Sequence, residues 1–277
     1  MTQAPPSLDI DADLARRILT DFLRTEIGRT GFSRGVVPVS GGLDSALACF
    51  LAAEALGKEQ VLALRLPHRS STPDSLEDGE TVIRITGVRS LTLPITDAAD
   101  ALLRGVPESD LIRRGNILAR LRMIVAYDQS ADFGGLVIGT GNKTEVLLGY
   151  TTLFGDSASA LNPLGDLYKT QVRQLARHIG VPEAILAKVP SAGLWPGQTD
   201  EGELGFTYAE VDRLLFLLVD ERRTPDECVA AGFEQPFVDR VLERIRRNQY
   251  KRMQPLIAKL SNRTVGYDFL YLRDWGT

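Results

Sequence analysis

The sequence has few of the residues from which proteins build disulfide frameworks and metal centres. Its 277 residues include two cysteines and two histidines. Cys49 and Cys228 are far apart and form no Cys-x-x-Cys pair, so neither a disulfide scaffold nor a zinc site is suggested. His68 and His178 are too isolated for a histidine metal site. These absences remove thiolate and imidazole metal chemistry from the functions to consider.

Long apolar runs are also absent. No segment approaches the roughly 20 apolar residues that a membrane span needs. Residues 1–11 contain neither the basic nor the apolar region of a signal peptide. A net charge of −4 gives no general attraction to nucleic acid or to acidic membranes. We therefore expect a cytoplasmic protein without a membrane or nucleic-acid partner.

The overall composition is that of an ordinary globular protein. Hydrophobic residues make up 44% of the chain and charged residues 25%, which is enough to bury a sizeable core. The length allows one large domain or two small ones. We predict one domain over residues 1–277, with a loose arm at 1–10 and an irregular tail at 254–277.

Strand and helix patterns alternate along the chain. Short apolar runs indicate strands at 35–39, 60–66, 90–93 and 134–139. Helical spacing of apolar residues indicates helices at 11–28, 45–56, 76–86, 96–103, 110–128, 145–150, 169–179, 208–220 and 237–247. This alternation predicts an α/β fold, with a Rossmann-like, mostly parallel sheet and helices on both faces. Ligands of such sheets bind beyond the carboxyl ends of the strands.

The most informative stretch joins the first predicted strand to the next helix and reads Val39-Ser40-Gly41-Gly42-Leu43-Asp44-Ser45. Glycines let the backbone turn sharply, and the free N–H groups at a helix start favour an anion. The turn lacks the Gly-Lys-Ser/Thr ending of a Walker A loop. Asp44 would repel a phosphate unless a divalent cation such as Mg²⁺ bridges the two. The stretch therefore predicts a metal-bound phosphate site rather than an ordinary capped turn.

Two further segments fall at predicted strand ends. Arg65 ends the second strand, and Gly139-Thr140-Gly141-Asn142-Lys143-Thr144-Glu145 follows the last one. Taken alone, the segment 139–145 is an ordinary glycine turn, in which the Glu145 carboxylate stabilises the N-terminus of the following helix. Because the carboxyl ends of parallel strands share one edge, we expect Glu145 and Asp44 to lie together and to bind Mg²⁺ carrying a triphosphate.

Lys169 and the stretch 190–201 complete the candidates. Taken alone, Lys169 is a solvated lysine at a helix start. The stretch 190–201 is punctuated by glycine and proline yet carries Trp195. It is either a surface connector or a lid over substrate, and the tryptophan favours the lid.

Five motifs occur in an order that resembles a known family. Ser40-Gly-Gly-Leu-Asp-Ser45 resembles the pyrophosphate-binding loop of the ATP pyrophosphatase superfamily, whose fold is adenine nucleotide alpha-hydrolase-like. The other four are Asn116-Ile-Leu-Ala-Arg-Leu-Arg-Met123, Gly139-Thr-Gly-Asn-Lys-Thr-Glu145, Leu167-Tyr-Lys-Thr-Gln-Val172 and Pro190-Ser-Ala-Gly-Leu-Trp-Pro-Gly-Gln-Thr-Asp-Glu201. Together they resemble the NAD synthetase family over residues 36–253.

The resemblance implies a ligase that forms a C–N bond. ATP would adenylate the nicotinate carboxylate of deamido-NAD and release pyrophosphate, and ammonia would attack the acyl-adenylate to give NAD and AMP. The resemblance also implies Mg²⁺ bound by Asp44 and Glu145. ATP would contact Ser40, Gly41, Gly42, Asp44, Ser45, Arg65, Thr140, Lys169 and Ser191, of which Lys169 and Ser191 are also catalytic, and deamido-NAD would contact Arg120 and Lys251.

Some positions depart from the family pattern. Leu153 and Ala160 stand where many members place a lysine and an aspartate that bind deamido-NAD, and Tyr250 replaces a histidine. Members that use glutamine carry a separate glutaminase domain, for which the stretch before the ATP loop leaves no room, so ammonia is the expected nitrogen donor. The family is typically a homodimer, and the helix at 110–128 is the candidate interface.

Two other functions stay open from the sequence. One is another ATP pyrophosphatase, such as a tRNA-modifying or GMP-forming amidotransferase module. It would use the basic run 244–252 as an RNA contact, but a solvated helix face explains that run more simply. The other is a non-catalytic ATP-binding module. Asp44 and Glu145 argue against it, because a passive nucleotide sensor needs no metal-bridged triphosphate.

Overall fold

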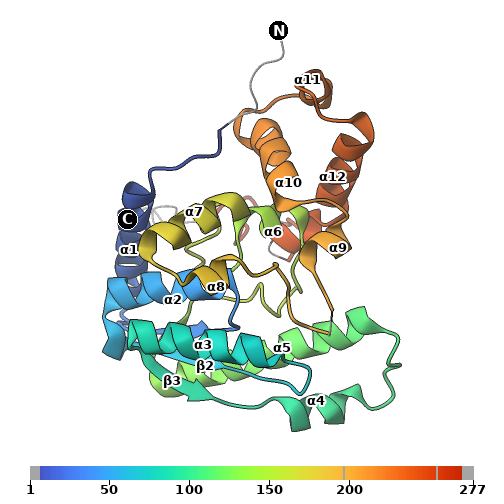
Figure 1. The fold of residues 1–277 in the computed structure, drawn as a ribbon. Helices are drawn as coiled ribbons and strands as arrows, with labels where there is room; N and C mark the ends of the chain where they lie inside the picture. Colours follow the sequence, from blue (N-terminus) through green and yellow to red (C-terminus); the bar gives the residue numbers. More distant parts are fainter. Residues whose placement is uncertain (1–6, 196, 254, 270–277) are drawn as a thin grey trace.

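A parallel β-sheet lies at the centre of the computed structural model, which describes residues 7–195, 197–253 and 255–269 (Figure 1). Its strands are β1 (Gly35–Pro38), β2 (Val61–Arg65), β3 (Arg89–Thr92) and β4 (Leu136–Val137). They lie in the order β3-β2-β1-β4, so that β1 pairs with β2 on one side and with β4 on the other. The chain adds strands on one side of β1 and then on the other, and such a switch point opens a crevice at the carboxyl ends of the strands.

Helices cover both faces of this sheet. One face carries α1 (Ala12–Arg29), α2 (Leu43–Leu56), α3 (Pro73–Thr86), α7 (Lys169–Ile179) and α8 (Glu183–Leu186), and the other carries α4 (Thr96–Leu103) and α5 (Leu111–Phe133). Successive residues of β1 point to opposite faces, so Val37 joins the first core and Val36 the second. A short turn, η1 (Lys58–Gln60), leads into β2. Burial on both faces explains why the strands appear in the sequence as short apolar runs.

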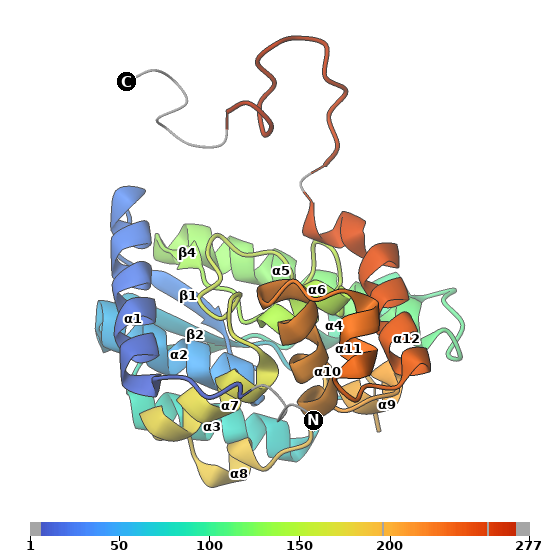
Figure 2. The ribbon, with the colours of Figure 1, turned by 90° about the horizontal axis from the view of Figure 1, so that it is seen from above.

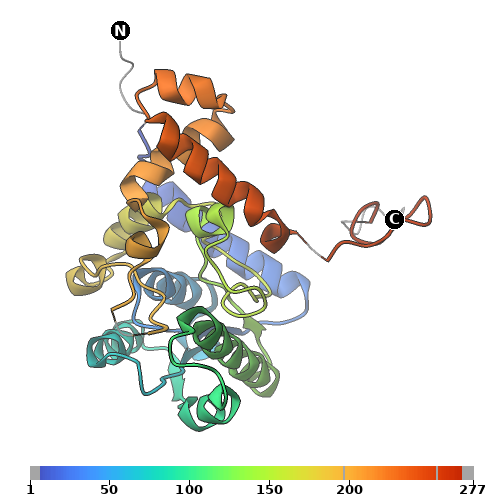
Figure 3. The same ribbon diagram turned by 90° about the vertical axis from the view of Figure 1, so that its right-hand side faces the viewer.

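A second group of helices has a core of its own. It consists of α6 (Lys143–Leu148), α9 (Asp200–Leu204), α10 (Tyr208–Leu215), α11 (Pro225–Ala230) and α12 (Gln235–Arg247), with the short turns η2 (Phe216–Asp220) and η3 (Gln249–Arg252). Leu148, Val211 and Val241 are fully buried in this core. Figure 3 shows the orange and red helices of this group standing beside the layers of the sheet.

The predicted α/β fold, with a parallel sheet and helices on both faces, is confirmed. The stretch 190–201, expected to be a connector or a lid, is only partly a loop, because α9 begins at Asp200. Thr199 caps that helix by accepting a hydrogen bond from the N–H of Gly202. The sequence patterns also missed α8 and α11, which span four and six residues and are too short for helical periodicity to show.

The two ends of the described chain behave differently. Leu8 accepts hydrogen bonds from Gln171 and Gln174 of α7, and Ile10 donates one to Gln174. This end of the expected loose arm is therefore tied to the body. Residues 255–269 run away from the rest of the molecule (Figure 2), and the single domain stays a prediction. Among the residues that the structure describes, no helix is long and apolar enough to cross a membrane.

Candidate active site

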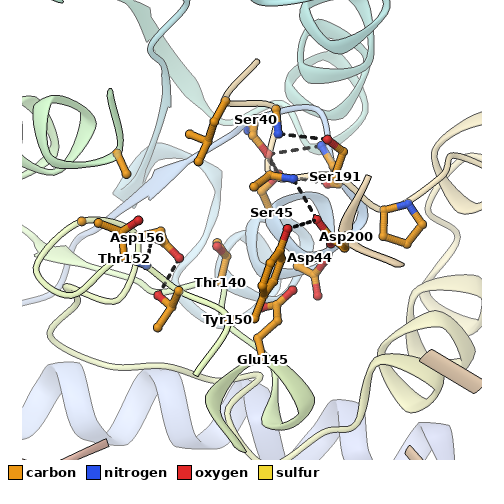
Figure 4. A pocket seen from close by; sticks show the side chains of 18 of the residues that line it. Ser40, Asp44, Ser45, Thr140, Glu145, Tyr150, Thr152, Asp156, Ser191 and Asp200 are labelled. Atoms are coloured by element: carbon orange, nitrogen blue, oxygen red, sulfur yellow. Dashed lines mark hydrogen bonds between the residues drawn. The ribbon is translucent and has the colours of Figure 1, made fainter. Parts of the chain in front are cut away.

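A cleft of about 1180 Å³ opens at the carboxyl ends of β1, β2 and β4, and Figure 4 looks into it. It lies beside the switch point at β1, where a ligand site is expected. The second helix group supplies part of its wall through α12. Most of the predicted site residues line it: Ser40, Gly41, Gly42, Asp44, Ser45, Arg65, Thr140, Glu145, Lys169, Ser191 and Lys251.

The Ser40 turn (residues 40–45) is built for close approach by an anion. Gly41 has a φ of 80°, and a Cβ at this position would lie 2.1 Å from the carbonyl oxygen of Ser75, so only glycine fits. The hydroxyl oxygens of Ser40 and Ser45 lie 3.0 Å apart. Gly42 is the N-cap residue of α2 and, lacking a side chain, does not cap the first N–H groups of the helix. The first turn of α2 therefore presents uncapped N–H groups and two hydroxyls to the cleft.

Asp44 and Glu145 come from different parts of the chain and meet at one ammonium group. Asp44 lies in the first turn of α2, and Glu145 lies in the first turn of α6. Lys169 donates a hydrogen bond to Asp44 Oδ2, and its Nζ lies 3.6 Å from Glu145 Oε1. The side chains of Asp44, Glu145 and Lys169 are 16%, 19% and 5% exposed. The structure thus brings both expected metal ligands to one largely buried point.

Asn142 positions the two carboxylates. Its side-chain amide donates to Asp44 Oδ1 at 2.9 Å, and its Oδ1 accepts from the backbone N–H of Glu145 at 3.0 Å. Glu145 Oε2 in turn accepts from the backbone N–H of Asn142 at 3.1 Å, which completes a capping box. We did not single out Asn142 from the sequence. Asn followed three residues later by Glu at a helix start is the signal that identifies it.

Burial and neighbouring charges shift the pKa values of this cluster. Burial raises the pKa of Glu145 to about 8; the charge of Lys169 opposes the rise, and that of Asp44 adds to it. Burial alone would lower the pKa of Lys169, but the charges of Asp44 and Glu145 outweigh it and raise that pKa. Lys169 therefore stays a cation, whereas Glu145 exchanges its proton near neutral pH.

The donor set of this cluster fits Mg²⁺ on a nucleotide. Carboxylate oxygens are ligands that Mg²⁺ prefers, and both carboxylates face the cleft. Within the described part of the chain, no three His, Cys, Asp or Glu side chains gather closely enough to hold a metal ion alone. An ion held by Asp44 and Glu145 would therefore need further oxygens, which a bound triphosphate can supply.

The other expected ATP contacts surround the same cleft. Arg65 pairs with Glu80 at 2.6 Å, while its Nε is buried without a hydrogen-bond partner. The hydroxyl of Ser191 is exposed and accepts from the N–H of Gly193 at 3.1 Å. Thr140 lines the cavity (Figure 4). Their roles in binding ATP stay predictions.

The stretch 190–199 links α8 to α9, and its residues Leu194 and Trp195 reach α5. Leu194 packs against the core on the α5 side of the sheet. A Cβ built on Gly115 of α5 would lie 3.1 Å from Trp195 Cζ3, so the tryptophan rests against that helix. A segment that contacts α5 while lining the cleft is placed as a lid would be, and its closure over a substrate stays a prediction.

Asp200 fixes the far end of this stretch. Its carboxylate accepts hydrogen bonds from the backbone N–H of Ala192 at 3.1 Å and from the hydroxyls of Tyr150 and Tyr208 at 3.1 and 3.0 Å. Burial raises the pKa of Asp200. Asp200 was not predicted as a site residue. No local pattern identifies it, because its hydrogen-bond partners lie 8 or 50 residues away in the sequence.

The expected deamido-NAD contacts lie apart. Lys251 lines the cleft, and its Nζ donates to the carbonyls of Gly149 and Thr151 at 2.8 and 2.7 Å. Arg120 is exposed and is not among the lining residues; its Nε donates to the carbonyl of Leu153 at 3.3 Å. The arginine two residues later, Arg122, does line the cleft. The structure therefore does not bring Arg120 together with the other predicted site residues.

The parallel sheet, the glycine turn after β1 and the paired carboxylates define a nucleotide-binding α/β protein of the ATP pyrophosphatase class. The family model described as NAD synthase matches residues 15–255. The chain belongs to the NAD synthase family.

Known proteins resemble the chain over almost its whole length. An NH₃-dependent NAD⁺ synthetase from Chlorobium phaeobacteroides is 54% identical over 268 residues, which are 97% of each chain. The structure of an NMN synthetase from Francisella tularensis matches with a TM-score of 0.80 and 33% identity, covering 91% of this chain and 100% of that one. An NH₃-dependent NAD synthetase from Campylobacter jejuni matches with a TM-score of 0.78 and 31% identity over the same shares.

Proposed function

We propose that the chain is an ammonia-dependent NAD synthetase, a ligase that forms a C–N bond. The observation that carries the proposal is the meeting of Asp44, Glu145 and Lys169 beside the Ser40 turn. The cleft at this point, at about 1180 Å³, exceeds the roughly 300–1,000 Å³ of pockets for single small ligands. It therefore has room for two nucleotides.

The reaction proceeds in two steps. A carboxylate oxygen of the nicotinate group of deamido-NAD attacks the α-phosphorus of ATP, and the bond from that phosphorus to the bridging oxygen breaks to release pyrophosphate. Ammonia then attacks the carbonyl carbon of the acyl-adenylate. The C–O bond to AMP breaks, the nitrogen loses a proton, and the amide of NAD remains. AMP leaves with one of the original carboxylate oxygens.

The Ser40 turn binds the part of ATP that leaves. Uncapped N–H groups at the start of α2 and the hydroxyls of Ser40 and Ser45 suit the oxygens of pyrophosphate. Lys169 adds a fixed positive charge where negative charge grows on the leaving group. Asp44 and Glu145 would hold Mg²⁺, which when bound neutralises phosphate charge. Ser191 and Arg65 complete the proposed ATP site.

The stretch 190–199 protects the intermediate from water. An acyl-adenylate that meets water returns to the carboxylate, so ATP would be consumed without product. Leu194 and Trp195 rest against α5 and shield the cleft. Positioning of the two substrates then supplies much of the rate, and no nucleophilic side chain is needed.

We also propose that two copies of the chain form a homodimer through α5. Large apolar side chains on this helix are exposed, with Ile112 at 71% and Ile124 at 56%. Exposed large apolar side chains on one helix are candidates for a protein interface. The expected cytoplasmic location stays a prediction.

The decisive experiment is a product assay with purified protein. ATP, Mg²⁺, ammonium and deamido-NAD are expected to give NAD, AMP and pyrophosphate in equal amounts, measured by liquid chromatography. Absence of NAD at saturating ammonium would contradict the proposal. Salt-dependent binding of tRNA without NAD formation would favour the tRNA-modifying alternative.

Replacing Asp44 tests the phosphate end of the site. Asp44→Ala removes one proposed metal ligand, so we expect pyrophosphate release to fall by at least a hundredfold. The fold should be retained, as judged by circular dichroism, but the melting temperature should fall because Lys169 loses its buried partner. Glu77→Gln, which changes an exposed carboxylate of α3 outside the cleft, serves as the matched control. Full activity of the Asp44 variant would remove this residue from the metal site.

A second candidate function is amidation of the mononucleotide. The neighbour from Francisella tularensis is an NMN synthetase, and its likeness to this chain favours testing nicotinate mononucleotide beside deamido-NAD. The curated relative with 54% identity favours the dinucleotide. A higher kcat/KM for deamido-NAD than for the mononucleotide is the expected result.

A further inference from the structure

A ridge of arginines on α12 faces the same cleft from the side of the second helix group. Arg240, Arg244 and Arg247 are spaced by four and three residues, so they share one face of the helix. All three line the cleft. The helix itself is held by Val238 and Val241, which are fully buried. The ridge therefore forms part of the cleft wall, while Arg240 and Arg247 are also exposed to solvent.

Arg244 is the most informative member of this ridge. Its Nε is buried and has no hydrogen-bond partner. Its guanidinium lies over the ring of Tyr150, 5.7 Å from the ring centroid, which fixes the plane of the group. Burial lowers its pKa. A half-buried guanidinium with an unsatisfied N–H is unfavourable unless a ligand supplies the acceptor.

The protein itself leaves most of this positive charge unbalanced. Among the ion pairs of the described residues, the ridge takes part in one, between Arg247 and Glu243 at 3.9 Å, and both side chains are mainly exposed. Glu203, the acidic group that acts on Arg244, already accepts a hydrogen bond from Gln198 at 2.7 Å. Three arginines on the wall of a cleft, joined to an acidic side chain by a single exposed ion pair among the described residues, indicate an anionic ligand.

We propose that the ridge formed by Arg240, Arg244 and Arg247 binds the phosphate groups of the second nucleotide, with Arg244 as the central contact. The inference rests on the proposed function, in which two phosphate-bearing substrates share one cleft. The Ser40 turn takes the phosphates of ATP, and the α12 ridge takes those of deamido-NAD. Guanidinium groups bind phosphate oxygens through paired N–H bonds, which a lysine cannot reproduce.

Calorimetric titration with deamido-NAD, in the absence of ATP, tests this assignment directly. We expect Arg244→Ala to weaken binding at least tenfold and Arg244→Lys to weaken it by a smaller factor. Arg246→Ala is the matched control, because Arg246 lies on the same helix, is exposed and does not line the cleft. It should bind as the wild type does. In turnover assays the KM for deamido-NAD should rise in Arg244→Ala while the KM for ATP stays within twofold.

Different results overturn different claims. If wild-type protein neither binds deamido-NAD nor forms NAD, the proposed function fails. If wild-type protein binds it and Arg244→Ala binds it equally well, the ridge alone fails. A loss of RNA binding with unchanged deamido-NAD affinity would also overturn the ridge assignment. Should Arg244→Ala fold poorly, Arg240→Ala replaces an exposed member of the ridge and should weaken binding by a factor of about three to ten.

Discussion

Two carboxylates and one ammonium group form the centre of the site. Lys169 is almost fully buried and touches both Asp44 and Glu145. Removing charges from water is costly, and mutual attraction offsets that cost only when the geometry is good. Lys169 is hydrogen-bonded to Asp44 and lies 3.6 Å from Glu145 Oε1, and burial raises the pKa of Glu145.

The raised pKa of Glu145 predicts how stability depends on pH. A folded-state pKa near 8, against about 4.3 in the unfolded chain, means that the folded protein binds a proton that the unfolded chain releases. Stability of the wild type thus falls as pH rises through this window. Glu145→Gln resembles the protonated form, so without Mg²⁺ its melting temperature should exceed that of the wild type by roughly 10 °C at pH 8.5.

The difference should vanish near pH 3, where the wild-type side chain is protonated in both states. Differential scanning fluorimetry from pH 3 to 9 measures it. Glu77→Gln on α3 controls for the loss of one negative charge. A melting difference that is constant with pH, or that grows as pH falls, would contradict the raised pKa.

The residues of this centre were partly predictable from the sequence. Asp44 stood out because a carboxylate in a phosphate turn requires a cation, and Glu145 because it follows another strand of the same sheet. The dependence of both on Lys169 could not be predicted, since this residue lies 125 positions from Asp44. Arg120 illustrates the reverse case, in which a family motif supplied a role but the structure places the side chain outside the cleft.

At the scale of elements, one buried carboxylate joins three helices. Asp212 of α10 is fully buried. Its Oδ1 accepts from the hydroxyl of Thr144 at 2.6 Å and its Oδ2 accepts from the N–H of Thr170 at 2.8 Å. The hydroxyl of Thr144 also accepts from the N–H of Lys169 at 3.0 Å. Asp212 therefore sets the relative positions of α6 and α7, which carry Glu145 and Lys169.

Asp212→Asn should disturb this junction while leaving its shape almost unchanged. The new amide oxygen can accept from the N–H of Thr170, but its NH₂ group then faces the Thr144 hydroxyl, which loses its acceptor. We expect a loss of about 2 kcal/mol in unfolding free energy and at least a tenfold loss of kcat. Urea denaturation and the product assay measure the two effects.

Asp239→Asn on the exposed side of α12 is the control for this substitution. It should leave both the unfolding free energy and kcat close to those of the wild type. Wild-type kcat in Asp212→Asn, together with reduced stability, would show that Asp212 is structural and does not position Glu145 and Lys169.

The elements themselves show where sequence patterns succeed. The long helices α1, α5 and α12 display apolar residues at helical spacing over three turns or more. The expected ends of α1 and α12 lie within two residues of the observed ones, whereas α5 continues five residues beyond its expected end. The short helices α8, α9 and α11 depend on caps and tertiary packing. Local periodicity carries too little information to identify them.

At the scale of the whole molecule, exposed apolar side chains on α5 predict self-association. Replacing Ile112 and Ile124 by lysine places charges on the proposed interface, so we expect the double variant to sediment as a monomer where the wild type sediments as a dimer. Ile85→Lys on α3, which is also half exposed, is the matched control. Sedimentation velocity at micromolar concentration measures the difference, and a wild type that sediments as a monomer would contradict the dimer.

The sheet with its covering helices and the second helix group both line the cleft. The sheet and α2 offer the phosphate turn, and the second helix group offers α12 and the anchor of the stretch 190–199. On the proposed function, each part would supply its own anion-binding surface, and the two nucleotides would lie with their reactive groups between them. This division was not visible in the sequence, where the basic run 244–252 suggested a solvated face.

On the proposed function, ATP adenylates the nicotinate carboxylate of deamido-NAD in this cleft. Deamido-NAD carrying ¹⁸O at both oxygens of its nicotinate carboxylate tests this most directly. After turnover with ATP, Mg²⁺ and ammonium, mass spectrometry should find one ¹⁸O in each AMP and one in the amide of NAD. Unlabelled AMP, or formation of ADP with labelled phosphate, would contradict the account.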